Sequence, residues 1–244
     1  MRVLSVLVLL AIFGANQVSA GVVTSNVIFG TGVTNGSFTV AQAGGVELGL
    51  RAKLRYNAAG NPENTFNEIG PGKYAFDPGV APTQPATRGV WSYEWSINSD
   101  FDGTSGFKLD DLTYSLSMTS TNGASLAASD IINQFPFNPF ADHAIGNSST
   151  AEGAGTVANL FNYNNLIANN TLAQNSWRAD LYANNYDPTL TGTYTYTLSA
   201  FHNGNQVVST SIDVLVGVVP EPTSLMIFSS MIGMMIVPFR HRRK

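Results

Sequence analysis

The 244-residue chain contains no cysteine, and charged residues make up only 11% of it. The absence of cysteine excludes a disulfide scaffold, thiolate catalysis and cysteine-ligated metal sites. Asn, Ser, Thr and Gly take the place of charged residues, and this composition favours turns and β-strands over helices.

Histidine is also scarce, and only His143 and His202 lie away from the chain ends. A metal site or a His-based catalytic pair would need both, and nothing in their spacing brings them together. We expect each to be a surface or loop histidine. The chain also lacks a Gly-x-Ser-x-Gly elbow, a phosphate-cradling glycine loop and a His-Glu-x-x-His helix, so hydrolase and metalloprotease functions are not favoured.

The first 20 residues have the pattern of a secretion signal. Met1 and Arg2 precede the apolar run 3–13, and Val18-Ser19-Ala20 before Gly21 suits signal peptidase. We expect cleavage between Ala20 and Gly21, which would place the mature protein outside the cytoplasm.

The C-terminal end carries a Pro-Glu-Pro motif, an uncharged apolar stretch and a basic cluster: Pro220, Glu221 and Pro222; residues 223–239; and Arg240, Arg242, Arg243 and Lys244. At 1.5 Å per residue the apolar stretch spans roughly 25 Å, slightly less than a hydrocarbon core. Because basic residues stay on the cytoplasmic side, we expect a short transmembrane helix with the motif outside, within reach of a protease. An ordinary anchor or a buried helix is the alternative.

These three features resemble the PEP-CTERM sorting signal of exported bacterial proteins. The resemblance implies that exosortase, an integral-membrane cysteine protease, processes the tail 218–244 at its motif. Segments 46–57, 95–103 and 109–114 are also similar to a recurrent body found among PEP-CTERM proteins of unassigned function. That second resemblance supports one continuous domain and implies no catalytic residues.

The body between the two signals, residues 21–217, carries seven Lys/Arg and fifteen Asp/Glu, a net charge of −8. An acidic body repels phosphate backbones, so no nucleic-acid partner is expected. The body is long enough to bury a core without disulfides.

Apolar and polar residues alternate with period two in several segments of the body: 46–56, 90–98, 112–119, 176–183, 193–201 and 207–216. Such strands belong to antiparallel sheets with one face buried and one face wet. Gly, Pro and Asn mark the connections, including the hairpin-like His202-Asn203-Gly204-Asn205. We predict an all-β fold, a single β-sandwich of jelly-roll or immunoglobulin-like type.

The segment 130–174 interrupts this pattern. Residues 135–140 are too rich in proline for a central strand. A short helix within 156–174, through Val157, Leu160, Phe161 and Ile167, is possible, although the many asparagines disfavour it. If the body has a binding site, this insertion is a natural wall for it.

The best candidate for a chemical site is the loop that begins Asp100-Phe101-Asp102-Gly103. Asp100 and Asp102, with Asp110 or Asp111, resemble the opening of an oxygen-rich calcium loop, although the EF-hand's third ligand and distal glutamate are missing. The alternative, which we favour, is a tight Asp-Gly turn whose carboxylates cap backbone amides. No other cofactor is expected.

Two further patterns have a functional and a plain interpretation. Glu94 with Asp100 or Asp102 could form the carboxylate pair of a glycosidase if a cleft brings them together. Trp91, Tyr93 and Trp95 could form a sugar-stacking strip, but aromatics alternating strictly on one strand more often fill a core.

From these observations we expect an exported, non-enzymatic protein of the cell surface or exopolysaccharide matrix, first anchored by its tail and then cut by an exosortase-like protease. The alternative is an extracellular carbohydrate-binding module, which predicts at least one accessible tryptophan. A secreted glycoside-active enzyme, which would need a cleft with two carboxylates, is a third hypothesis.

Overall fold

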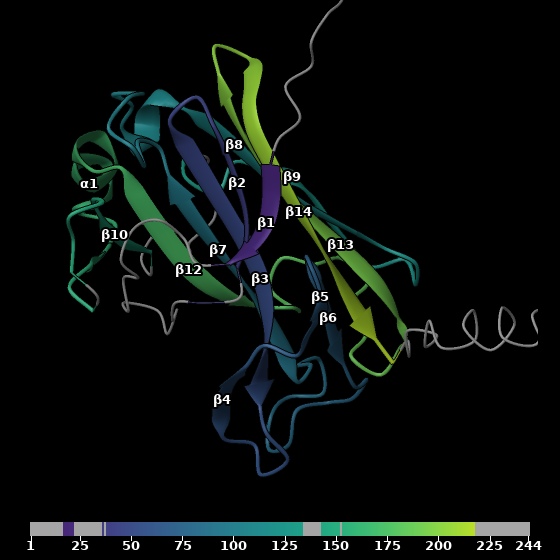
Figure 1. Cartoon of the computed structure of the whole chain (residues 1–244). Helices are drawn as coiled ribbons and strands as arrows, with labels where there is room; N and C mark the ends of the chain where they lie inside the picture. Colours follow the sequence, from purple (N-terminus) through teal and green to yellow (C-terminus); the bar gives the residue numbers. More distant parts are fainter. Residues whose placement is uncertain (1–16, 22–35, 37, 134–142, 152, 218–244) are drawn as a thin grey trace, which may run out of the picture.

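The computed structural model describes residues 17–21, 36, 38–133, 143–151 and 153–217. This part of the chain is mostly β-structure in two sheets, which confirms the predicted all-β class (Figure 1). The residues 1–16 of the predicted signal peptide and the tail 218–244 lie outside the described residues. No helix among the described residues is long and apolar enough to cross a membrane.

The first sheet, called sheet A here, has eight strands. Its path follows the order β1 (Gln17–Gly21), β2 (Phe38–Ala43), β3 (Val46–Tyr56), β7 (Trp91–Asn98), β12 (Leu172–Arg178), β10 (Ala144–Gly146) and β11 (Thr156–Val157), and β4 (Pro62–Thr65) pairs with β3 off this path. All of these pairings are antiparallel.

The second sheet, sheet B, has six strands in the order β5 (Glu68–Gly70), β6 (Lys73–Phe76), β14 (Asn205–Val216), β13 (Gly192–His202), β8 (Thr113–Ser120) and β9 (Ser125–Ser129). Its pairings are antiparallel except for the parallel pair β14–β6. The short strands β4 and β5 lie in the segment 57–72, between β3 and β6.

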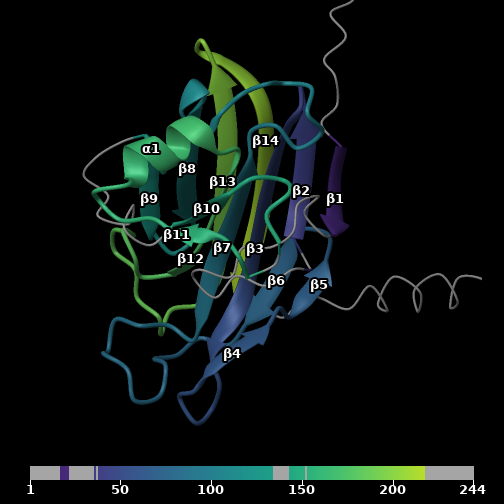
Figure 2. The same ribbon diagram turned by 90° about the vertical axis from the view of Figure 1, so that its left-hand side faces the viewer.

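Buried apolar residues of both sheets form one main hydrophobic core, and Figure 2 shows how the two sheets lie beside each other. Trp91 of sheet A contacts Tyr194 and Tyr196 of sheet B edge-on, with ring centroids 5.4 and 6.2 Å apart. Such aromatic pairs add about 0.5–1.5 kcal/mol each beyond the burial of their area. Trp91, Trp95 and Trp177 are at most 3% exposed, so the aromatic strip on β7 fills the core, as favoured from sequence.

The predicted hairpin between β13 and β14 is confirmed. Its two turn residues, Asn203 and Gly204, both have positive φ (51° and 78°), which is the backbone of a type I′ turn. Residues 46–56 and 91–98 form strands as expected, whereas the strand predicted at 176–183 begins earlier and occupies Leu172–Arg178.

The insertion contains one short helix, α1 (Tyr163–Asn169), beside β10 and the 3₁₀ turn η1 (Leu109–Asp111). Ile167 is buried on this helix as predicted. Val157, Leu160 and Phe161, however, precede the helix and are exposed, so only one of the four apolar residues suggested for a helix lies on it. Asparagines at its N-cap and C-cap positions help to explain the short helix, since they favour turns over helix interiors. The proline-rich residues 135–140 lie outside the described residues.

The outer faces of the two sheets differ, which corrects the expectation of a wet polar face on every strand. On β13 the outward-facing Thr195 and Thr197 are partly exposed, as expected. On sheet A the outward-facing Arg51, Lys53 and Glu94 are at most 1% exposed. Alternation in the sequence shows which residues share a face, but it does not show whether that face is covered.

Candidate functional site

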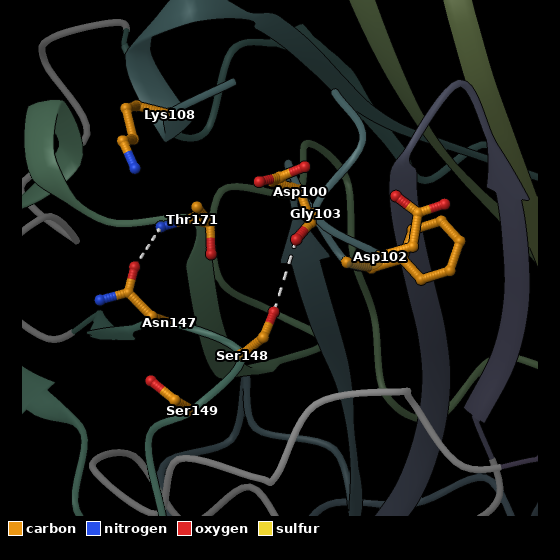
Figure 3. A pocket seen from close by; sticks show the side chains of 9 residues that line it. Asp100, Asp102, Gly103, Lys108, Asn147, Ser148, Ser149 and Thr171 are labelled. Atoms are coloured by element: carbon orange, nitrogen blue, oxygen red, sulfur yellow. Dashed lines mark hydrogen bonds between the residues drawn. The ribbon is translucent and has the colours of Figure 1, made fainter. Parts of the chain in front are cut away.

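A polar cavity of about 450 Å³ lies at the end of sheet A where β7 stops and β12 starts (Figure 3). It is lined by Asp100, Phe101, Asp102, Gly103, Lys108, Asn147, Ser148, Ser149 and Thr171. Three segments meet here: the loop after β7, the loop after β10 and the residue that precedes β12. The insertion therefore does supply one wall of a cavity, as predicted.

Hydrogen bonds within the loop after β7 fix its aspartates. Asp100 Oδ1 accepts from the backbone N–H and the hydroxyl of Ser105, both at 2.9 Å. Asp102 Oδ1 accepts from the backbone N–H of Thr104 at 3.0 Å and from its hydroxyl at 2.6 Å. These bonds confirm the Asp-Gly turn with carboxylates capping amides, and Gly103 has the positive φ (77°) that such a turn favours.

The same loop packs tightly against the turn between β2 and β3. The backbone N–H of Phe101 donates to the carbonyl of Gly45 at 2.9 Å. A Cβ on Gly45 would lie 2.8 Å from the backbone nitrogen of Ser105, and the φ of Gly45 is +77°, so only glycine fits. This contact anchors the wall of the cavity to the sheet.

The opposite wall is fixed by the side chain of Asn147. Its Oδ1 accepts from the backbone N–H of Thr171 at 3.2 Å, and its Nδ2 donates to Oδ1 of Asn170 at 2.9 Å. Ser148 accepts a hydrogen bond from Nδ2 of Asn98 at 3.1 Å. Both walls are therefore held in place by the protein itself.

Lys108 is the one basic side chain that lines the cavity. Its backbone N–H donates to Oδ2 of Asp111, the last residue of η1, at 2.7 Å, and its side chain extends along the cavity (Figure 3). None of the ion pairs found among the described residues involves Lys108. The cavity thus presents two carboxylates and one ammonium group.

The structure brings Asp100 and Asp102 together at this cavity, while Asp110 lies on η1 and does not line it. No group of three Asp, Glu or His residues that could hold a metal ion occurs in the described ranges. Calcium binding by Asp100, Asp102 and Asp110 stays a prediction.

Glu94 does not line the cavity, so it does not form a carboxylate pair with Asp100 or Asp102 there. It lies on the outer face of β7, where Arg51 and Lys53 form ion pairs with its carboxylate. The Thr104 hydroxyl lowers the pKa of Asp102, which makes this carboxyl group a poor general acid.

His143 lies in the loop directly before β10, as one of the two expected placements, but it is fully buried and therefore not a surface histidine. Its Nε2 lies 3.0 Å from the carbonyl of Ile131, and its Nδ1 lies 2.9 Å from Nδ2 of Asn175. Burial lowers its pKa to about 4, so the ring is neutral at pH 7. His202, at the end of β13, packs on the ring of Phe107 with centroids 4.6 Å apart.

The predicted signal-peptidase site lies at the N-terminal edge of the described body. Ala20 and Gly21 belong to β1, where they pair with Thr39 and Phe38 of β2. Cleavage between them would remove four of the five residues of β1 and leave β2 at the edge of sheet A. At the other end, the backbone N–H of Gly217 donates to the carbonyl of Phe76 at 2.9 Å.

The motif Pro220, Glu221 and Pro222 and the basic residues Arg240, Arg242, Arg243 and Lys244 lie outside the described residues. Sequence reasoning found Asp100 and Asp102 but missed Lys108, Ser149 and Thr171 as part of the same cavity. Lys108 ends the same loop as the two aspartates, whereas Ser149 and Thr171 come from distant parts of the chain, and no local pattern joins them to it.

No family model, curated protein or solved structure matches the chain significantly.

Proposed function

We propose that this is an exported, non-enzymatic protein of the bacterial cell surface or exopolysaccharide matrix, anchored at first by its C-terminal tail. Signal peptidase removes residues 1–20, and an exosortase-like membrane protease cuts at Pro220–Pro222. The observation that carries the proposal is the order of motif, apolar stretch and basic cluster directly after the last strand, β14, which ends at Val216. Only a few residues separate the end of the β-structure from the motif.

The body supports a binding or structural role more than a catalytic one. All three tryptophans are buried, so the sugar-stacking strip that an aromatic binding module needs is not formed by tryptophan. The cavity holds two aspartates, but Asp102 is a poor general acid because its pKa is lowered. For the arrangement of the two sheets, we propose a β-sandwich related to the jelly-roll or immunoglobulin-like type.

Intact mass spectrometry of the protein from native cells tests the proposed processing. The test variant replaces Pro220, Glu221 and Pro222 by alanine. The matched control replaces Pro62 and Glu63 of β4, the other Pro-Glu pair of the chain, by alanine.

We expect the wild type and the control to end near residue 222 and the test variant to keep the tail. Full-length mass in all three proteins would make the tail a plain anchor and overturn the proposed sorting.

A further inference from the structure

We infer that the cavity at the end of sheet A (Figure 3) binds a neutral saccharide by hydrogen bonds to the hydroxyl groups of its sugar rings. The inference rests on the proposed function only for the source of the saccharide, which is the extracellular matrix. The cavity volume of about 450 Å³ is in the range of small-molecule sites.

The charges of the site decide which class of saccharide fits. Asp100 and Asp102 accept hydrogen bonds, and a carboxylate that accepts from a hydroxyl forms a strong, charge-assisted bond. The same two carboxylates repel uronic acids and sulfated sugars, as does the body's net charge of −8. A neutral polyhydroxyl ligand meets no such repulsion.

Lys108 and the serines complete the set of polar groups. The Lys108 ammonium can donate to hydroxyl or ring oxygens, and the hydroxyl of Ser149 can donate or accept. A saccharide hydroxyl does both, so donors and acceptors on the protein are each matched.

Phe101 supplies the apolar contact that sugar rings also use. Phe101, which stands between the two aspartates in the sequence, is partly exposed and lines the cavity. Aromatic rings offer a flat apolar face, on which the C–H side of a sugar ring can pack. Binding here therefore does not need an exposed tryptophan.

The site is also formed before the ligand arrives. The bonds from Ser105 to Asp100 and from Thr171 to Asn147 hold both walls in place. A preformed site loses little side-chain freedom on binding, which favours affinity for a small, flexible ligand.

Affinity electrophoresis of the full-length protein in a non-ionic detergent tests the inference. The gels contain mannan, dextran, galactan or xylan as neutral probes, or alginate as an anionic probe. The test variants are Asp102→Asn and Lys108→Gln.

The chain offers a matched control, because Asp187 forms the same turn as Asp102 but lies outside the cavity. Asp187 Oδ1 accepts from the backbone N–H of Thr189 at 2.9 Å and from its hydroxyl at 2.7 Å. Asparagine keeps the Oδ1 acceptor, so Asp102→Asn and Asp187→Asn should disturb their turns equally.

We expect at least one neutral polysaccharide to retard the wild type and the Asp187→Asn variant, with no retardation by alginate. The dissociation constant should rise about tenfold in Asp102→Asn and in Lys108→Gln, since each loses a charge-assisted hydrogen bond. Retardation by none of the four neutral probes, or equal retardation of all variants, would overturn the inference. An uncut tail together with normal saccharide binding would contradict only the proposed sorting. A cut tail without saccharide binding would contradict only this inference.

Discussion

The outer faces of the two sheets differ in how exposed they are and in how their polar groups are satisfied. Both outer faces carry polar residues. The outer face of sheet B is partly exposed and carries hydroxyl groups, whereas the centre of the outer face of sheet A is buried and carries charged groups. On sheet B, Thr195 donates to Asp213 at 2.8 Å and Thr197 donates to the hydroxyl of Ser211 at 3.4 Å. Water can satisfy these groups if the protein does not, so each contact contributes little to stability.

On sheet A the charged groups must be satisfied by the protein. Glu94 forms ion pairs with Arg51 and Lys53, and the guanidinium of Arg51 lies 4.2 Å from the ring centroids of both Phe38 and Phe66. Burial lowers the pKa of Arg51 and Lys53, and the charge of Glu94 opposes that effect. When one charge of a buried ion pair is removed, the remaining buried charge is left unpaired and lowers the stability of the fold.

The largest expected effect follows from removing that shared partner. Glu94→Ala leaves Arg51 and Lys53 buried without their carboxylate, and we expect a loss of about 3–5 kcal/mol in the free energy of unfolding. Asp213→Ala on sheet B should cost less than about 1 kcal/mol, because its bond to Thr195 is partly exposed. Urea unfolding of both variants measures the difference. Equal losses would show that the two faces are not distinct.

Acid should destabilise sheet A through His143, which packs against Trp95, Trp177 and Tyr163. Its pKa is about 4 in the folded chain and 6.5 in the unfolded chain, so the unfolded state binds the extra proton first. The neutral ring contributes fully to the free energy of unfolding above pH 6.5, and this contribution falls by about 3 kcal/mol as the pH drops to 4.

Unfolding by urea at pH 7.5 and pH 4.5 checks this, with His143→Gln as the comparison. The variant should lose less stability between these two pH values than the wild type. A parallel loss in both proteins would assign the acid sensitivity to other groups.

The smallest expected effect on stability comes from removing single hydroxyl groups, one buried on sheet A and one partly exposed on sheet B. Ser92 Oγ on sheet A is buried and has no hydrogen-bond partner within the described ranges. Ser92→Ala removes this unsatisfied group, so we expect unchanged stability or a gain of up to about 1 kcal/mol. Ser117→Ala, on the partly exposed face of β8, should change stability by less than about 0.5 kcal/mol. A clear loss in Ser92→Ala would show that its hydroxyl does have a partner.

The contrast between the sheets also shows how far the sequence could be interpreted. Period-two alternation found the strands 46–56 and 91–98 and the tryptophans of the core, because alternation alone decides which side chains share a face. It could not show that Arg51, Lys53 and Glu94 are buried, since burial depends on what lies over the face. Of the four apolar residues suggested for a helix in the insertion, only Ile167 lies on α1, because Val157, Leu160 and Phe161 do not pack inward.

The candidate site was only half visible in the sequence. The turn chemistry of Asp100 and Asp102 is local, so the spacing of Asp, Gly and Thr predicts it. The cavity as a whole is not local, because Ser149 and Thr171 reach it only through the pairing of β7 with β12 and of β12 with β10. Strand order of this kind cannot be deduced from the periodicity of single segments.

The most direct test of the central claim, that this protein is exported, is the N-terminal residue of the mature protein from native cells. Residues 17–20 cannot be both part of a removed signal and part of the edge strand beside β2. Our account predicts that peptide mapping finds Gly21 as the first residue. A chain that still begins at Met1 or Arg2 would keep β1 in sheet A and contradict export by signal-peptide cleavage.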